Sequence, residues 1–179
     1  MRIIGGRLKG IQFYAPTNLP VRPTTDMAKE ALFNILYNNY DFDECEILDL
    51  FSGTGSVSFE FASRGAKKIT AVDKHPGCIA WIKSIITKHD LNEIEPAKAD
   101  VLKFLAQDTH QYQIIFADPP YDLPSIPQIP ELVFNNNLLA PNGLLVVEHA
   151  TYTKLNQQPG YTHTRKYGNS SFSFFEDQE

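Results

Sequence analysis

Residues 47–73 read ILDLFSGTGSVSFEFASRGAKKITAVD, and they set the fold of this 179-residue chain. An apolar run at 47–51 leads into a glycine turn, which is followed by a helical stretch from about Val57 to Arg64 and a second apolar run at 69–72. Short apolar runs of this kind are typical of buried strands. Two such strands joined by a helix form a βαβ unit, which is parallel and has a right-handed crossover.

The same alternation continues to the end of the chain. Further helices are expected near 77–89, 102–106 and 127–136, and further strands near 97 and at 114–117, 144–147, 161–167 and 172–175, the last two forming a hairpin around Gly168-Asn169. Buried strands linked by helices favour a parallel sheet. We therefore predict an α/β fold with a mostly parallel, seven-stranded, doubly wound sheet, to which the closing hairpin adds an antiparallel strand.

The amino-terminal segment, 1–40, lies outside this pattern. Residues 1–15 are typical of a short β-hairpin, with a turn signal at Gly5-Gly6. Prolines stiffen the segment that follows, and Thr24 or Thr25 can cap a helix that runs to about Asn39. We expect a single domain over 1–179, in which this hairpin and helix extension (1–40) precedes a Rossmann-like catalytic core (41–179).

Composition and charge exclude several classes of protein. No apolar run approaches the length that a membrane span needs, and the amino terminus has no apolar signal-peptide core. Cys45 and Cys78 lie far apart, and the histidines show no ligand spacing. We therefore expect a cytoplasmic protein with no membrane span, no disulfide and no metal site.

The formal net charge of −5 hides a basic amino terminus. Residues 1–30 carry a net charge of +3, because the acidic Asp26 and Glu30 are outnumbered by five basic side chains, Arg2, Arg7, Lys9, Arg22 and Lys29. A basic front end is typical of enzymes that act on nucleic acids. Ordinary solvated surface charge is the alternative interpretation.

A doubly wound sheet binds its ligand beyond the carboxyl ends of the strands. The loop after the first strand, DLFSGTG at 49–55, has glycines where the backbone turns sharply into a helix, and Asp73 follows at the end of the next strand. A carboxylate there can accept hydrogen bonds from both ribose hydroxyls of a nucleoside. The alternative is that the glycines make only a tight turn and that Asp73 caps a helix.

The pattern favours S-adenosylmethionine over a nicotinamide dinucleotide. The dinucleotide fingerprint has a third glycine for close packing near a pyrophosphate, and this chain has Ser58 there. Asp100 ends the third strand and can accept from the adenine amino group, with Val101 beside the ring, although Asp100 can equally cap a helix. The expected cofactor-binding residues in this part of the chain are Asp49, Phe51, Ser52, Gly53, Thr54, Gly55, Asp73, Lys74, Asp100 and Val101.

The fourth strand ends in the tetrad Asp118-Pro119-Pro120-Tyr121, at the same edge of the predicted sheet. An exocyclic base amine is a poor nucleophile because its lone pair is delocalised into the ring. The Asp118 carboxylate and the Pro119 carbonyl can each accept one amino hydrogen, while the prolines fix the backbone. Tyr121 offers a face on which a base can stack. The tetrad indicates methylation of a base amine; a rigid turn at the end of a strand is the alternative.

With these motifs in place, the chain resembles the RsmD type of ribosomal RNA methyltransferases. The resemblance rests on Met1–Gly6, Arg22–Asp26, Glu30–Asn34, Phe51–Gly55, Ser63–Ala66 and the tetrad. It implies a class I methyltransferase fold, Arg22, Thr24 and Thr25 close to the cofactor, and a basic hairpin that holds RNA, with Arg22 and Lys29 assisting. The chain departs from the family pattern at Met27 and Ser58, where the family commonly has Arg and Gly.

The resemblance also implies the substrate, which is the 2-amino group of a guanine in the 16S RNA of the small ribosomal subunit. An Asp at the first tetrad position is frequent among guanine 2-amino enzymes, whereas amine methyltransferases for adenine usually have Asn. We expect a monomer that acts better on the ribonucleoprotein particle than on isolated RNA, because its basic residues are few. The alternatives are an adenine-N6 methyltransferase, a non-catalytic RNA-binding module and a nicotinamide-dependent oxidoreductase.

Overall fold

The computed structural model describes residues 1–21 and 24–177. Its helices are α1 (Asp26–Tyr37), the short 3-10 helix η1 (Phe42–Glu44), α2 (Ser56–Ser63), α3 (Pro76–His89), α4 (Val101–Gln107) and α5 (Gln128–Asn135). Its strands are β1 (Glu46–Leu50), β2 (Lys68–Asp73), β3 (Ile94–Lys98), β4 (Tyr112–Ala117), β5 (Leu139–Ala150), β6 (Tyr161–Tyr167) and β7 (Ser170–Glu176).

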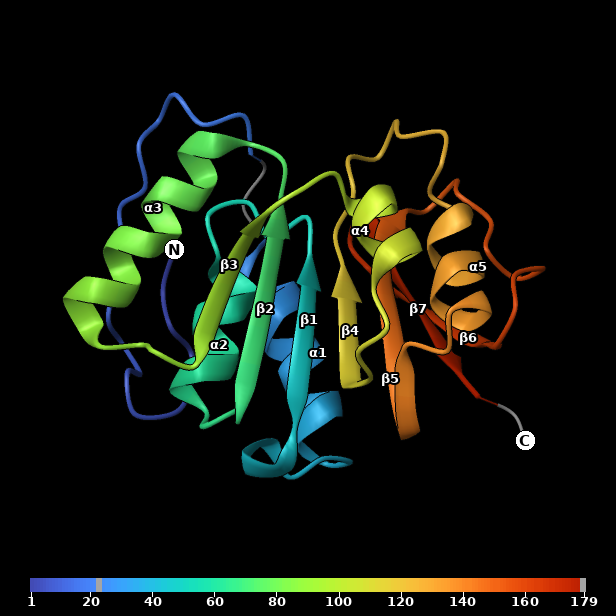
Figure 1. Cartoon of the computed structure of the whole chain (residues 1–179), viewed down its shortest axis with the longest axis horizontal. Helices are drawn as coiled ribbons and strands as arrows, with labels where there is room; N and C mark the ends of the chain where they lie inside the picture. The colour runs from blue at the N-terminus through green and yellow to red at the C-terminus, as the bar shows by residue number, and fades with distance from the viewer. Residues whose placement is uncertain (22–23, 178–179) are drawn as a thin grey trace.

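All seven strands form one sheet in the order β3-β2-β1-β4-β5-β7-β6 (Figure 1). The pairings from β3 to β5 are parallel, and β7 pairs antiparallel with both β5 and β6. The predicted α/β fold with a mostly parallel seven-stranded sheet is therefore confirmed. Because β7 runs antiparallel to β5, the turn between β6 and β7 lies beside the carboxyl end of β5.

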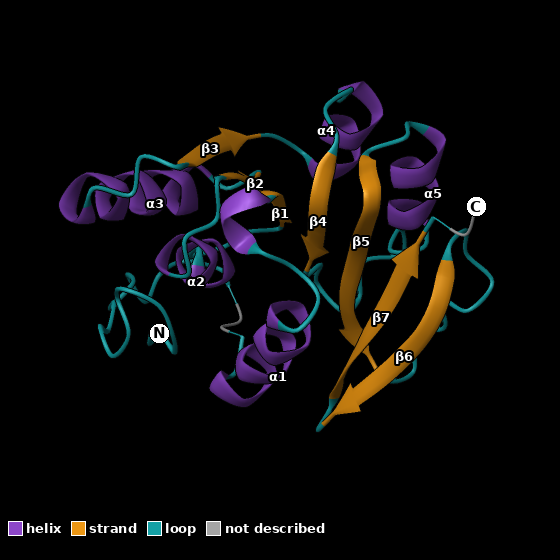
Figure 2. Ribbon diagram, turned by 90° about the horizontal axis from the view of Figure 1, so that it is seen from below, coloured by secondary structure: helices purple, strands orange, loops and turns teal. Residues whose placement is uncertain are grey.

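Helices cover both faces of the sheet, as Figure 2 shows for α1 and α2 on one side and α4 and α5 on the other. One core cluster packs under α1, α2 and α3 and includes Phe33, Phe61 and Phe116. A second packs under α4 and α5 and includes Leu105 and Val133. Burial of both faces explains why the central strands are almost continuously apolar in the sequence.

The structure differs from the sequence prediction at the start of β5. The strand begins at Leu139, whereas the apolar pattern predicts a start at 144. Residues 141–143, Pro-Asn-Gly, are a turn signal, and Asn142 has a left-handed backbone with φ 62°. The pairing with β4 shifts register between Tyr112 and Ile114, so an irregular segment is accommodated inside the strand.

The predicted amino-terminal hairpin is present in reduced form, with one antiparallel bridge between Arg2 and Gln12. It packs on α2, where the Glu60 carboxylate accepts hydrogen bonds from the Ile4 and Gly5 backbone N–H groups, both at 2.9 Å. Gly6 has φ +79°, and a Cβ atom there would lie 2.0 Å from the Ser63 carbonyl oxygen. The hairpin backbone therefore approaches α2 more closely than any side chain allows.

Among the described residues, no helix is both long and apolar enough to cross a membrane.

Candidate functional site

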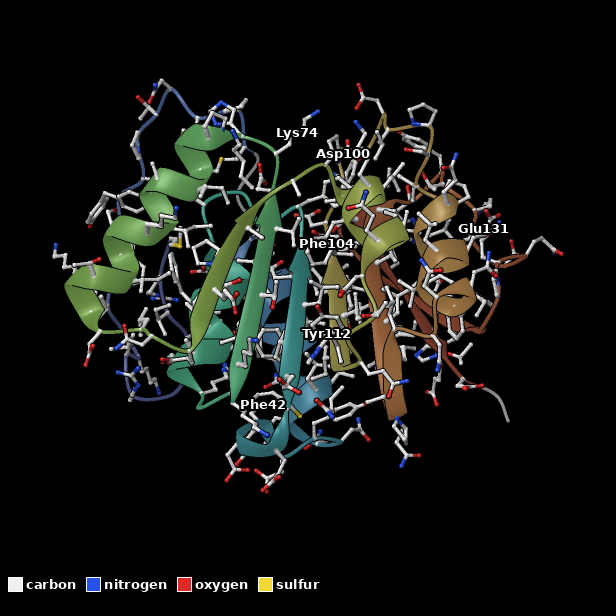
Figure 3. All side chains as sticks on the ribbon, viewed as in Figure 1. Phe42, Lys74, Asp100, Phe104, Tyr112 and Glu131 are labelled. Atoms are coloured by element: carbon white, nitrogen blue, oxygen red, sulfur yellow. The ribbon has the colours of Figure 1, made fainter. Side chains whose placement is uncertain are left out.

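A cavity of about 530 Å³ opens at the carboxyl ends of β1, β2 and β4. Its lining brings together most of the predicted cofactor and catalytic residues: Asp49, Phe51, Ser52, Gly53, Thr54, Asp73, Lys74, Asp100, Val101, Asp118, Pro119, Pro120, Tyr121 and also Thr24. Figure 3 labels Lys74 and Asp100 at this edge of the sheet. One cavity thus joins the glycine loop to the tetrad, although three strands and three helices separate them along the chain.

The loop after β1 is strained and contains a buried polar atom that is left without a partner. Phe51 has a left-handed backbone with φ 59°, which is unusual for a large side chain and is found mostly at functional sites. Ser52 donates its backbone N–H to the Val72 carbonyl at 2.9 Å. Its buried Oγ has no hydrogen-bond partner within the described chain, so it is available to a polar ligand in the cavity.

Gly55 serves packing, and its predicted role in cofactor binding stays a prediction. It is not among the described residues that line the cavity. Its φ is +86°, and a Cβ atom there would lie 2.9 Å from the Phe59 ring and 3.1 Å from Ile82. Gly55 therefore lets the first turn of α2 pack against α3.

Asp73 joins the glycine loop to the start of α3. One carboxylate oxygen accepts from the Gly53 N–H and the other from the His75 N–H, both at 2.9 Å. The cap of α3 is His75, whose Nδ1 accepts from the Gly77 N–H at 3.0 Å, so the interpretation of Asp73 as the helix cap is wrong. Each carboxylate oxygen has a second lone pair for a ligand.

Two other predicted cofactor residues cap helices. Asp100 caps α4, since its carboxylate accepts from the Lys103 N–H at 3.1 Å, and it also lines the cavity. Thr25 caps α1, with its Oγ1 accepting from the Ala28 N–H at 3.2 Å, and it is not among the described lining residues. The adenine contact of Asp100 stays a prediction. Arg22, predicted to lie near the cofactor and the RNA, falls outside the described residues.

Four carboxylates line the cavity, those of Asp49, Asp73, Asp100 and Asp118. Asp49 is buried, and its carboxylate accepts from the Ser58 hydroxyl at 2.7 Å. Burial in the first place, with repulsion from Asp118 and Asp73, raises the pKa of Asp49 to about 7, although the hydrogen bond from Ser58 opposes the rise. At the position where the dinucleotide fingerprint has its third glycine, this chain thus has Ser58, whose hydroxyl donates a hydrogen bond to Asp49. A cavity of this polarity is complementary to a cation and unfavourable for a pyrophosphate.

The tetrad leaves the sheet where β4 ends. The Asp118 N–H donates to the Leu50 carbonyl at 3.3 Å, which fixes the start of the tetrad against the end of β1. Pro119 is buried, and the Pro120 carbonyl accepts from the Leu123 N–H at 3.0 Å. The chain therefore turns tightly beside the cavity, with Asp118 and Tyr121 half-buried in its wall.

Lys29, predicted to contact RNA, is buried in the core, and this prediction is wrong. Only 1% of its side chain is exposed. Its Nζ donates to the Arg2 carbonyl at 2.6 Å and to the Ser56 hydroxyl at 3.2 Å, and it lies 3.3 Å from the Glu60 carboxylate. Lys29 thus fixes the hairpin, α1 and α2 to one another.

The other basic residues of the hairpin are exposed, but Arg7 lies away from the cavity. Arg7 pairs with Glu93, just before β3, at 3.2 Å. That position is at the amino ends of the strands, opposite the cavity. Arg2 pairs with Asp26 at the start of α1, also at 3.2 Å, and Lys9 is exposed on the hairpin turn. RNA contact by Arg2, Arg7 and Lys9 stays a prediction.

Sequence reasoning missed the apolar wall of the cavity, to which Val21, Leu102 and Phe116 belong. Phe116 could have been found, because it lies on β4 two residues before Asp118, which directly follows the strand, and alternation along extended backbone points both side chains to the same face. Nothing in the sequence indicates Val21, which packs close to Gly53 although the whole of α1 and β1 lies between them along the chain. In the described part of the chain, no group of three or more His, Cys, Asp or Glu side chains could hold a metal ion.

Known proteins are similar to this chain over most of its length. The model of the family described as Conserved hypothetical protein 95 matches residues 1–176. A ribosomal RNA small subunit methyltransferase D from Haemophilus influenzae is 35% identical over 83% of this chain and 78% of its own length. The one from Buchnera aphidicola is 31% identical over 89% and 81%. The solved structure of yhhF from Escherichia coli, a protein assigned to the methyltransferases, superposes with a TM-score of 0.83 at 26% identity, covering 98% of this chain and 96% of that one.

Proposed function

The chain belongs to the Conserved hypothetical protein 95 family, that of the ribosomal RNA small subunit methyltransferases D, and from this premise we propose that it is an S-adenosylmethionine-dependent 16S rRNA methyltransferase. Its proposed target is the 2-amino group of a guanine. The observation that carries the proposal is the cavity in which the Asp118 tetrad shares a wall with the glycine loop and Asp73. The enzyme is proposed to act as a monomer in the cytoplasm.

The residues of the cavity fit the cofactor. Its volume of about 530 Å³ suits a nucleoside-sized ligand. Asp73 ends β2, where its carboxylate can accept from ribose hydroxyls, and the Ser52 hydroxyl offers a further polar contact. The four carboxylates that line the cavity favour a cationic ligand over an anionic dinucleotide, which supports a sulfonium cofactor. When bound, S-adenosylmethionine supplies an electrophilic methyl group.

The tetrad is proposed to hold the amine. The Asp118 carboxylate and the Pro119 carbonyl each accept one N–H, which holds the nitrogen toward tetrahedral geometry and localises its lone pair. A hydrogen bond to a charged acceptor contributes about 1.5–3 kcal/mol, so orientation must supply much of the remaining acceleration. With S-adenosylmethionine bound, an amine held in this way would face the methyl group that the cofactor would supply, and one N–H proton would leave to water. No strong base is needed.

The RNA must present one unpaired base to the cavity. Exposing a base is cheap in a loop and costs a few kcal/mol in a duplex, so a structured loop is the proposed target. Tyr121 supplies a face for stacking, worth about 1–3 kcal/mol per base. The chain carries a net charge of −5, and for this reason we propose that the assembling small subunit is a better substrate than isolated RNA.

Mapping of modified nucleosides in 16S rRNA by mass spectrometry tests the proposal. Cells that lack the gene are expected to lose one N2-methylguanosine, and the wild-type gene should restore it. An Asp118→Ala variant should fail to restore the nucleoside while still binding S-adenosylmethionine in calorimetry. Methyl label on adenine would refute the guanine assignment, and restoration by the Asp118→Ala variant would support a non-catalytic RNA-binding role.

A further inference from the structure

The edge strand β6 carries an exposed basic strip that lies at the same edge of the sheet as the cavity. Residues 162–166 of β6 are all exposed, and β7 is its only strand neighbour in the described sheet. The strip consists of Arg165 and Lys166, whose side chains leave opposite faces of the edge strand β6, and of Tyr152 and Lys154 in the loop that follows β5. Tyr152 is 71% exposed.

The charge of this region is opposite to that of the whole chain. Residues 151–175 contain three basic side chains and no Asp or Glu, whereas the chain has a net charge of −5. Within the described residues, the ion pairs do not include Lys154, Arg165 or Lys166. Their positive charge is therefore available to an anionic partner.

Strand register places the strip level with the tetrad. Arg165 pairs with Phe172 on β7, and Phe172 pairs with Glu148 on β5. Glu148 follows Val147, which pairs with Ala117, the residue before Asp118. Arg165 and Asp118 thus lie in one row across four strands, and three strand spacings separate them by about 14 Å.

The loop after β5 extends the strip over the carboxyl edge of the sheet. Ala150 is the last residue of β5 and pairs with Ser170, next to the turn between β6 and β7. Lys154 lies close enough to His149 to affect its ionisation. Burial lowers the pKa of His149 most, and the positive charge of Lys154 lowers it further. The exposed ring of Tyr152 is a surface on which a base can stack.

We propose that this strip binds the RNA strand next to the target nucleotide, with Lys154, Arg165 and Lys166 contacting phosphates and Tyr152 stacking on a base. The inference rests on the proposed function and adds a second contact surface to it. Charge complementarity favours RNA, since positive side chains without carboxylates suit a polyanion. The strip lies at the edge of the active site, whereas Arg7 on the hairpin lies at the opposite edge.

The double variant Arg165→Ala/Lys166→Ala tests the strip against a matched control, Lys67→Ala/Lys88→Ala. The control removes the same charge from two exposed lysines at the amino ends of the strands. Binding of a 16S rRNA transcript is measured in buffers of increasing salt concentration, and methyl transfer is measured with tritiated S-adenosylmethionine. For two lost phosphate contacts, the slope of log K against log salt should become shallower by about 1.4. KM for RNA should rise, while kcat and cofactor affinity stay unchanged.

Two outcomes would contradict the proposal that the strip binds RNA. Both differ from the result expected if the proposed function is wrong. If the double variant binds the transcript with the affinity and salt slope of the control, the strip does not bind RNA. If it binds the transcript normally but loses affinity for the intact small subunit, the strip binds a protein instead. Failure of the proposed function would appear earlier, as wild-type protein that transfers no methyl group to RNA.

Discussion

The Asp49 side chain is enclosed at the end of β1, with 1% of the residue exposed. Burial raises the pKa of the Asp49 carboxyl from the ordinary value of 3.8 to about 7, so the folded protein holds the Asp49 proton at pH values where the unfolded chain has released it. Between these values the folded state binds more protons than the unfolded state. Stability therefore falls as the pH rises through this window, and the loss is complete above pH 7.

An Asp49→Asn variant should remove this pH dependence, because Asn is neutral and can still accept from Ser58. Between about pH 4 and 8, the free energy of unfolding of the wild type should fall by up to about 4 kcal/mol relative to the variant. Denaturant unfolding of both proteins across this range measures the difference. A difference that stays constant with pH would show that Asp49 is already ionised in the folded state.

Lys29 shows where residue types alone mislead. In the sequence it belongs to a basic segment together with Lys9, and both were expected to contact RNA. The two differ only in what packs around them, since Lys29 lies on the inner face of α1 opposite Glu60. Glu60 belongs to another helix, α2, so the sequence around Lys29 gives no sign of it. The helical periodicity of 26–37 did not indicate that Lys29 is buried, because lysines are rarely counted among buried residues.

The first turn of α2 depends on a glycine for its packing. A Gly55→Ala variant would place a methyl group against Phe59 and Ile82, whereas Gly65→Ala adds a methyl group in open space. Both glycines have φ between +86° and +89°, so the backbone cost of the two substitutions is similar. Gly55→Ala should lower the free energy of unfolding by about 2 kcal/mol more than Gly65→Ala, as measured by chemical denaturation. If both variants lost the same free energy of unfolding, α2 would be able to move away from the added methyl group without loss of stability.

The helices and strands were largely predictable because most have a simple hydrophobic period. α3 spans Pro76–His89 where 77–89 was expected, and β4 and β7 extend their expected cores by two residues or fewer at each end. The early start of β5 was hidden because it depends on pairing with Tyr112 of β4, a contact between distant residues. The 3-10 helix at Phe42–Glu44 was also missed, since so short an element cannot show a period.

The amino-terminal hairpin is part of the core of the whole molecule. Ile3 and Phe13 are 1% and 4% exposed, and they pack in the cluster under α1 and α2. Deleting residues 1–13 should lower the free energy of unfolding by about 3–6 kcal/mol, at about 1.5–3 kcal/mol for each buried side chain. Thermal unfolding checks this, with Lys9→Ala on the exposed turn as a control that should change little. An unchanged melting temperature would mean that the hairpin is a separate arm.

The arrangement of the whole molecule was predictable in part. Parallel strands bring their carboxyl ends to one edge, so the meeting of the glycine loop, Asp73 and the tetrad could be expected. The position of the hairpin could not, because the Glu60 contacts that hold it connect segments 55 and 56 residues apart. The basic strip on β6 was overlooked for a related reason. In a sum over the sequence, the acidic residues at the end of the chain cancel the positive charge of the strip. In the fold, Glu176 pairs with Leu144 near the amino ends of the parallel strands, at the edge of the sheet opposite the strip.

The two outer strands of the sheet also bear on how the protein behaves in a crowded solution. Within the described sheet, β3 and β6 each have one neighbour, and a bare strand edge invites pairing with another molecule. β3 contains Pro96, which has no N–H to donate, and β6 carries Arg165 and Lys166, whose charges would repel those of a second copy. The same two side chains that we propose to bind RNA therefore also disfavour pairing between the β6 edges of two molecules. For this reason the molecular mass of the Arg165→Ala/Lys166→Ala variant in solution should be measured together with its affinity for RNA.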